Sequence, residues 1–130
     1  MGRSYRDLVV WQKAMALVKA VYIASQSFPK QEMYGLTAQM RRAAVSIPCN
    51  IAEGQGRVFD REFSLFIGHA LGSLMELETQ IIIAAELGYL SSDTTNELLA
   101  KTGEVGRLAN GLRSSLKKGA AAGPPGPSAS

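Results

Sequence analysis

The chain of 130 residues contains one cysteine, Cys49, and one histidine, His69. One cysteine can form no disulfide within the chain and cannot supply a zinc site made of several cysteines. One histidine excludes a metal site with two histidine ligands, and a serine or cysteine nucleophile would have His69 as its only histidine base. These absences remove most catalytic chemistry, so we expect a protein that is not an enzyme, with no catalytic residues, metal or cofactor.

Long apolar runs are also missing. No uncharged apolar stretch reaches the roughly 18 residues that a membrane-spanning helix needs. The first residues lack the apolar segment of a signal peptide, and Arg6 stands where a myristoylation signal has serine or threonine. With a free cysteine and no export signal, we expect a cytoplasmic protein with no membrane partner.

Helical periodicity runs through most of the chain, without convincing strand alternation. It predicts four helices, over residues 8–27, 33–53, 60–87 and from 91 or 92 to about 117. Asp7 is the predicted N-cap of the first helix. Gly54 and Gly56 are predicted to close the second helix, and Gly88 is predicted to close the third. Pro48 is expected to kink the second helix without breaking it, because the apolar period continues beyond it.

Four helices of similar length with short connections favour an all-α, up-down-up-down antiparallel four-helix bundle over residues 1–118. Residues 119–130 contain only glycine, alanine, proline and serine, so we expect a disordered tail. The seam of the third helix repeats at alternating spacings of three and four, through Ile67, Ala70, Leu74, Leu77 and Ile81. The predicted stripe of the first helix is Leu8, Trp11, Met15, Val18 and Tyr22.

The first and third helices are apolar over more than one face. A bundle needs one buried stripe per helix, so the surplus predicts an interface between copies of the chain in a homo-oligomer. The alternative is that the surplus side chains close the core of a single chain more fully. Six residues are the candidates for the oligomer interface: Val9, Val10, Val21, Leu71, Met75 and Ile82.

The formal charge of +3 is unevenly spread. Residues 1–65 carry nine basic and five acidic groups, a net +4, whereas residues 66–130 carry five basic and six acidic groups, a net −1. A basic patch on the first half could contact an anionic partner such as RNA or DNA, and the alternative is a set of ordinary solvated charges. The candidate nucleic-acid-binding residues are Arg41, Arg42, Arg57, Arg61, Lys13 and Lys19.

The adjacent arginines Arg41 and Arg42 are predicted to have different roles. Arg41 and Arg42 diverge by about 100° around a helix, so one can pair internally while the other faces solvent or a phosphate. Glu78 is predicted to be partly buried, and one of these arginines is its expected partner. Arg113 and Lys117 are assigned to the end of the last helix, where cations suit the helix dipole.

Three other features favour structural roles over chemistry. The glycines before Arg57 follow a helix, whereas a phosphate-binding loop follows a strand, so we predict a helix end and a turn there. Phe66 stands three residues before His69, so the Glu-x-x-His motif of carboxylate-bridged metal bundles is absent. Cys49 is interpreted as a small packing residue.

Three segments together resemble one known family: DLVVWQKAMALV at 7–18, YGLTAQMRRAAVSIPCNIAEGQGR at 34–57 and EFSLFIGHALGSLMELETQIIIAAELGYL at 62–90. They resemble the four-helix bundle proteins of the 23S rRNA intervening-sequence family, with Cys49 where that family usually has serine. The resemblance implies a ring-like homopentamer. It also implies a relative, the accessory protein of diversity-generating retroelements, which binds nucleic acid and a reverse transcriptase through a basic surface. Arg41, Arg42 and Arg57 fall on the matching motif.

We therefore expect a non-enzymatic, homo-oligomeric four-helix bundle that binds RNA or DNA through its backbone charge. Sequence-specific readout is not expected, because no recognised docking module is present. The alternative is a protein-interaction scaffold or structural module that takes a partner protein and has no nucleic-acid ligand.

Overall fold

The computed structural model describes residues 4–121, with side chains to residue 117. It contains four α-helices: α1 (Val9–Ser25), α2 (Leu36–Gln55), α3 (Asp60–Glu86) and α4 (Ser92–Ala121). Two short 3₁₀ helices, η1 (Tyr5–Asp7) and η2 (Lys30–Glu32), precede α1 and α2. The part of the chain described here contains no strand, so the all-α prediction is confirmed.

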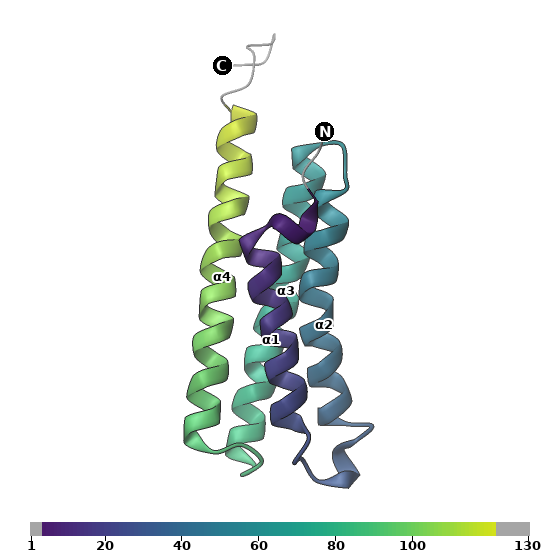
Figure 1. Cartoon of the computed structure of the whole chain (residues 1–130), viewed down its shortest axis with the longest axis vertical. Helices are drawn as coiled ribbons and strands as arrows, with labels where there is room; N and C mark the ends of the chain where they lie inside the picture. The colour runs from purple at the N-terminus through teal and green to yellow at the C-terminus, as the bar shows by residue number, and fades with distance from the viewer. Residues whose placement is uncertain (1–3, 122–130) are drawn as a thin grey trace.

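Each helix packs against two others. α1 and α3 each contact α2 and α4, while the diagonal pairs α1 with α3 and α2 with α4 make no close backbone approach. In Figure 1 the α1–α2 and α3–α4 connections lie at the lower end of the bundle, and the α2–α3 connection lies at the upper end. α4 extends above the other helices at that upper end (Figure 1). Residues far apart in sequence therefore meet along every edge of the bundle.

The core takes one stripe from each helix. In α3 the predicted seam is correct, since Ile67, Leu74 and Ile81 are fully buried. In α1 the predicted stripe is wrong, because Met15 and Tyr22 are exposed. The residues of α1 that fill the core are instead Val10, Ala14, Leu17 and Val21. The apolar positions of α1 surround more than one face, so periodicity alone could not select the buried one.

The helix starts differ from the sequence prediction. The N-cap of α1 is Leu8, which makes no side-chain cap, and Asp7 lies in η1. α2 begins at Leu36, three residues later than expected, because the side chain of Glu32 caps the helix at that residue. One carboxylate oxygen of Glu32 accepts a hydrogen bond from the Leu36 N–H at 3.2 Å, and the other accepts one from the Tyr89 hydroxyl at 2.9 Å. This hydrogen bond, with burial and the carboxylate charge adding, raises the pKa of the Tyr89 phenol above its ordinary value.

The C-terminal ends of α2, α3 and α4 agree with the sequence prediction in part. Gly88 closes α3 with a φ of 81°, in the left-handed region that favours glycine. Gly56 is the C-cap of α2, as predicted, whereas Gly54 lies inside the helix, which includes Pro48 and continues to Gln55. The expected start of the tail at residue 119 is also early, because α4 continues to Ala121. The remainder of the predicted tail, residues 122–130, lies outside the described residues.

Candidate functional site

The structure distributes the six candidate basic residues over three separate places. Lys13 and Lys19 lie on α1, and Lys13 reaches Glu104 of α4 at 3.7 Å. Arg41 and Arg42 lie in the first half of α2, while Arg57 and Arg61 flank the α2–α3 connection. Sixteen helical residues span about 24 Å, so the two arginine pairs sit near opposite ends of the bundle. The predicted patch is therefore not brought together within one chain.

Arg41 is the arginine that pairs internally. Its Nε donates a hydrogen bond to Ser25 Oγ at 2.9 Å, and a terminal guanidinium nitrogen donates to the Tyr22 carbonyl at 3.4 Å. The guanidinium also lies over the Tyr22 ring, 4.6 Å from its centroid. Arg42 is exposed. The expected partner Glu78 is wrong for both arginines, because Glu78 faces α4 and accepts a hydrogen bond from Thr102 Oγ1 at 2.6 Å.

Replacing Arg41 by alanine is expected to lower the melting temperature, with a loss of about 1–2 kcal/mol from the hydrogen bonds and the ring contact. The same change at Arg42 is expected to leave the melting temperature within error, because no such contacts hold that side chain. Thermal denaturation followed by circular dichroism measures both variants. Equal shifts for the two would contradict this division of roles.

Two other candidate cations are already paired. Arg57 forms an ion pair with Glu53 at 2.9 Å and lies 4.7 Å from the centroid of the Phe66 ring. Lys13 has Glu104 as its partner. Both ion pairs are exposed, so each contributes only about 0–1 kcal/mol to stability. Their carboxylates nevertheless offset part of the positive field that a phosphate would meet at these positions.

A groove between the start of α3 and the end of α4 has three cationic side chains in its lining. We call it the α3–α4 groove; it has a volume of about 590 Å³, and it is lined by Arg61, Glu62, Leu65, His69, Arg113 and Lys117, among others. Among the described side chains, none of its three cations forms an ion pair. Arg113 is half-buried and is positioned by a hydrogen bond to Asn110 Oδ1 at 3.1 Å.

Sequence reasoning identified Arg61 but missed the other side of this groove. Arg113 and Lys117 were assigned to the helix dipole, although they also face α3. One signal was available in the sequence: no acidic residue follows Glu104, whereas Arg107, Arg113, Lys117 and Lys118 do. The second half of α4 is therefore purely cationic, and its pairing with α3 could not be read from either helix alone.

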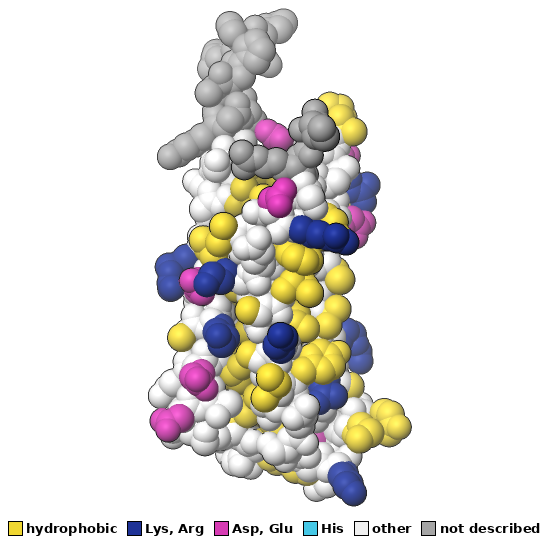
Figure 2. All heavy atoms as spheres, viewed as in Figure 1, with side chains coloured by type: hydrophobic (Ala, Val, Ile, Leu, Met, Phe, Trp, Pro, Cys, Tyr) yellow, Lys and Arg dark blue, Asp and Glu magenta, His cyan; other side chains and the backbone are white. Residues whose placement is uncertain are grey.

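The exposed apolar surface also differs from the sequence prediction. Val10 and Val21 are 5% and 0% exposed, so these two candidates belong to the core and offer a partner no surface. Leu71 is half-buried against the core, whereas Val9, Met75 and Ile82 are exposed. On the side of the bundle drawn in Figure 2, an apolar area lies over α1 and α2. We call it the α1–α2 face, and it comprises Trp11, Met15, Val18, Val45, Pro48 and Cys49, around a hollow of about 330 Å³.

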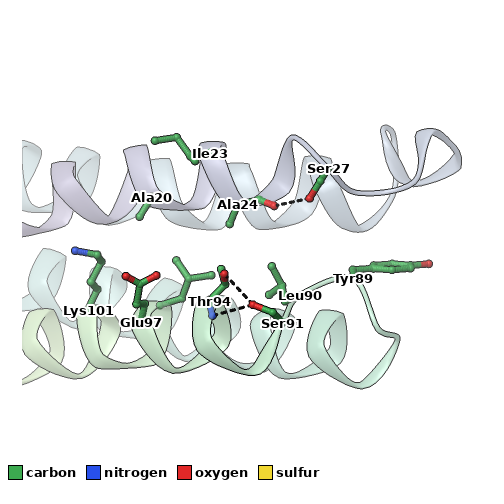
Figure 3. A pocket seen from close by; sticks show the side chains of 11 residues that line it. Ala20, Ile23, Ala24, Ser27, Tyr89, Leu90, Ser91, Thr94, Glu97 and Lys101 are labelled. Atoms are coloured by element: carbon green, nitrogen blue, oxygen red, sulfur yellow. Dashed lines mark hydrogen bonds between the residues drawn. The ribbon is translucent and has the colours of Figure 1, made fainter.

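A further hollow of about 550 Å³ lies between the lower ends of α1 and α4 (Figure 3). The small side chains of Ala20 and Ala24 line the hollow on α1. Glu97 and Lys101 project into it from α4, which forms its other side (Figure 3). The Ser91 hydroxyl accepts a hydrogen bond from the Thr94 N–H at 3.1 Å, so it caps α4. Ser91 and Thr94 at this hollow thus serve the start of the helix.

The titratable residues form no cluster with an evident chemical role. Over residues 4–117, no three histidine, cysteine, aspartate or glutamate side chains are grouped so that they could hold a metal ion. His69 is exposed, and its ring lies edge-on to Phe66 with centroids 5.5 Å apart. Cys49 is exposed on the α1–α2 face, so it packs less fully than the sequence suggested. Within the described chain, no helix is both long and apolar enough to cross a membrane.

These observations define a class of protein: an all-α bundle of four helices with a cationic groove and an exposed apolar face. A family model described as 23S rRNA-intervening sequence protein matches residues 6–111, and the chain belongs to this family. The match spans α1, α2, α3 and most of α4, and it ends before Arg113 and Lys117. No curated protein matches the chain.

Proposed function

We propose that the protein is a non-enzymatic nucleic-acid-binding protein of the cytoplasm, which binds the phosphate backbone of RNA or DNA without sequence specificity. The observation that carries the proposal is the α3–α4 groove, where Arg61, Arg113 and Lys117 converge with one carboxylate, Glu62. Guanidinium groups form strong, charge-assisted hydrogen bonds to phosphate oxygens. Such contacts supply affinity and register while reading no bases. The family description, which refers to 23S rRNA, supports an RNA-related role.

We further propose that the chain is related to the accessory protein of diversity-generating retroelements, and that it acts as a ring-like homopentamer built from up-down-up-down bundles. The α1–α2 face supports self-association, because it leaves Met15 and Val45 exposed beside the hollow at Cys49. Burial of such a surface between copies is favourable by about 25 cal/mol per Å² of apolar area. Five copies would carry a formal charge of +15, since one chain carries +3. The assembly would therefore attract a polyanion more strongly than one chain.

The test is a titration of the full chain against labelled RNA and labelled DNA at about 50 mM and about 200 mM salt. Each phosphate contact contributes to the slope of log affinity against log salt about −0.9 for duplex DNA and about −0.7 for a single strand. The three cations of the groove therefore predict a slope of about −2 to −3 for each engaged subunit. Absence of binding at the lower salt concentration would contradict the proposal.

Removing two groove charges should weaken binding more than removing two charges elsewhere. The variant Arg61→Gln/Arg113→Gln is expected to lose affinity for RNA and to flatten the salt slope by about 2 units for each engaged subunit. Its matched control is Lys30→Gln/Lys101→Gln, which removes the same net charge from exposed positions outside the groove. Equal losses for the two variants would show that net charge alone drives binding.

A protein-interaction scaffold is the second candidate function. The α1–α2 face favours it, because an exposed apolar hollow suits a partner protein as well as a second copy of the chain. A stoichiometric protein partner that persists after nuclease treatment, together with no salt-dependent binding of RNA or DNA, would favour this function over the first.

A further inference from the structure

The α2–α3 connection presents two apolar side chains to solvent at the upper end of the bundle. Val58 is 87% exposed and Phe59 is 64% exposed. Large apolar groups exposed on a connecting loop point to a contact with another molecule, because they contribute little to the core of the chain. The loop itself is anchored, since the Arg57 N–H donates a hydrogen bond to the Gly54 carbonyl at 3.0 Å.

Phe59 is held in place although its ring is exposed. It is the N-cap residue of α3, and its carbonyl accepts hydrogen bonds from the N–H groups of Glu62 and Phe63 at 3.0 and 3.1 Å. The first turn of the helix therefore fixes its backbone. Among the described rings, that of Phe59 takes part in no aromatic pair. A partner molecule thus meets an exposed aromatic ring on a backbone that is already positioned.

Phe59 is close to the α3–α4 groove along the chain, where the lining of the groove begins at Arg61. Phe59 precedes Arg61 by two residues, a separation that spans at most about 7 Å. A nucleotide whose phosphate contacts Arg61 could therefore place its base against Phe59. The α3–α4 groove continues from Arg61 to Arg113 and Lys117 on α4. Aromatic side chains beside a positively charged groove are the combination by which proteins bind single-stranded nucleic acids.

We propose that this end of the bundle binds single-stranded nucleic acid, with one base stacked on Phe59 and the following phosphates in the α3–α4 groove. The inference rests on the proposed function, and it specifies the strandedness of the ligand. In the interior of a duplex each base face is covered by the neighbouring base pairs, so Phe59 would have no face to stack on there. Val58 has no aromatic face, so it cannot take part in stacking.

The experiment compares a labelled, unstructured RNA strand with the same strand annealed to its complement, using fluorescence anisotropy and the full chain. Phe59→Ala is expected to weaken single-strand binding about tenfold and to leave duplex binding unchanged. Phe59→Trp should retain single-strand affinity, and stacking should quench the added indole fluorescence. Val58→Ala is the matched control, since it truncates a neighbouring exposed side chain and should leave single-strand binding unchanged.

Each outcome bears on one of the two proposals. Single-strand binding of Phe59→Ala equal to that of the unmodified chain would overturn stacking. The proposed function would stand in that case, provided that Arg61→Gln/Arg113→Gln still binds weakly. Equal affinity of the unmodified chain for strand and duplex would also overturn the single-strand inference. Full retention of affinity by Phe59→Leu would show apolar contact in place of stacking. No binding of either nucleic acid would overturn both proposals.

Discussion

Replacing Gly54 by alanine is expected to destabilise the bundle, although alanine is the better helix former. A Cβ atom built at Gly54 would lie 2.6 Å from Phe66 Cβ and 3.0 Å from a ring carbon of Phe63. The first of these atoms is tied to the backbone of α3, so α2 and α3 would have to move apart. Overpacking of this kind costs about 1–3 kcal/mol, which offsets or exceeds the gain of about 1 kcal/mol in helix propensity.

Gly72 supplies the matched control for this prediction. It lies in the middle of α3, and a Cβ atom built there would meet nothing within 4 Å. Gly72→Ala is therefore expected to stabilise the bundle by up to about 1 kcal/mol. Chemical denaturation of both variants measures the two changes. The account predicts opposite signs, and a Gly54→Ala variant as stable as Gly72→Ala would contradict the close packing of α2 on α3.

Placing charges on the α1–α2 face is expected to dissociate the assembly. Met15 and Val45 lie on α1 and α2 beside the same hollow, so Met15→Glu/Val45→Glu would bury two carboxylates without partners in any interface formed there. The mass in solution should fall from about 70 kDa, five times the chain mass, to the 13.9 kDa of one chain. Light scattering coupled to size exclusion measures this change.

The control for the assembly prediction charges the outward side of α3. Met75 and Ile82 were interface candidates from the sequence, and both are exposed. Met75→Glu/Ile82→Glu is expected to leave the mass unchanged. If this variant dissociates while Met15→Glu/Val45→Glu does not, the interface lies on α3. A monomeric unmodified chain would contradict self-association as a whole.

The sequence predicted the buried face well where one apolar seam keeps a regular spacing. The third helix is apolar over more than one face, but its seam at alternating spacings of three and four correctly identified Ile67, Leu74 and Ile81 as core residues. In α1 the apolar residues cover several faces, so the choice between Met15 and Val21 depended on which side the other helices occupy. That choice is a property of tertiary packing, and the local pattern carries no information about it.

The candidate site was predictable only in part, for a related reason. Arg61 and Arg113 are 52 positions apart, and they share a groove because α3 and α4 pack side by side. Gly54 was interpreted as a helix terminator, whereas its lack of a side chain allows α2 to approach Phe66. In both cases the function of the residue depends on a neighbouring helix that the local sequence does not specify.

The location of bound RNA on the chain tests the central claim most directly. Single-stranded RNA can be cross-linked to the full chain by ultraviolet light, and the modified peptides can then be identified by mass spectrometry. The account predicts adducts in the segment 58–69 and in the second half of α4, where the two sides of the α3–α4 groove meet. Adducts confined to α1 and the first half of α2 would contradict it.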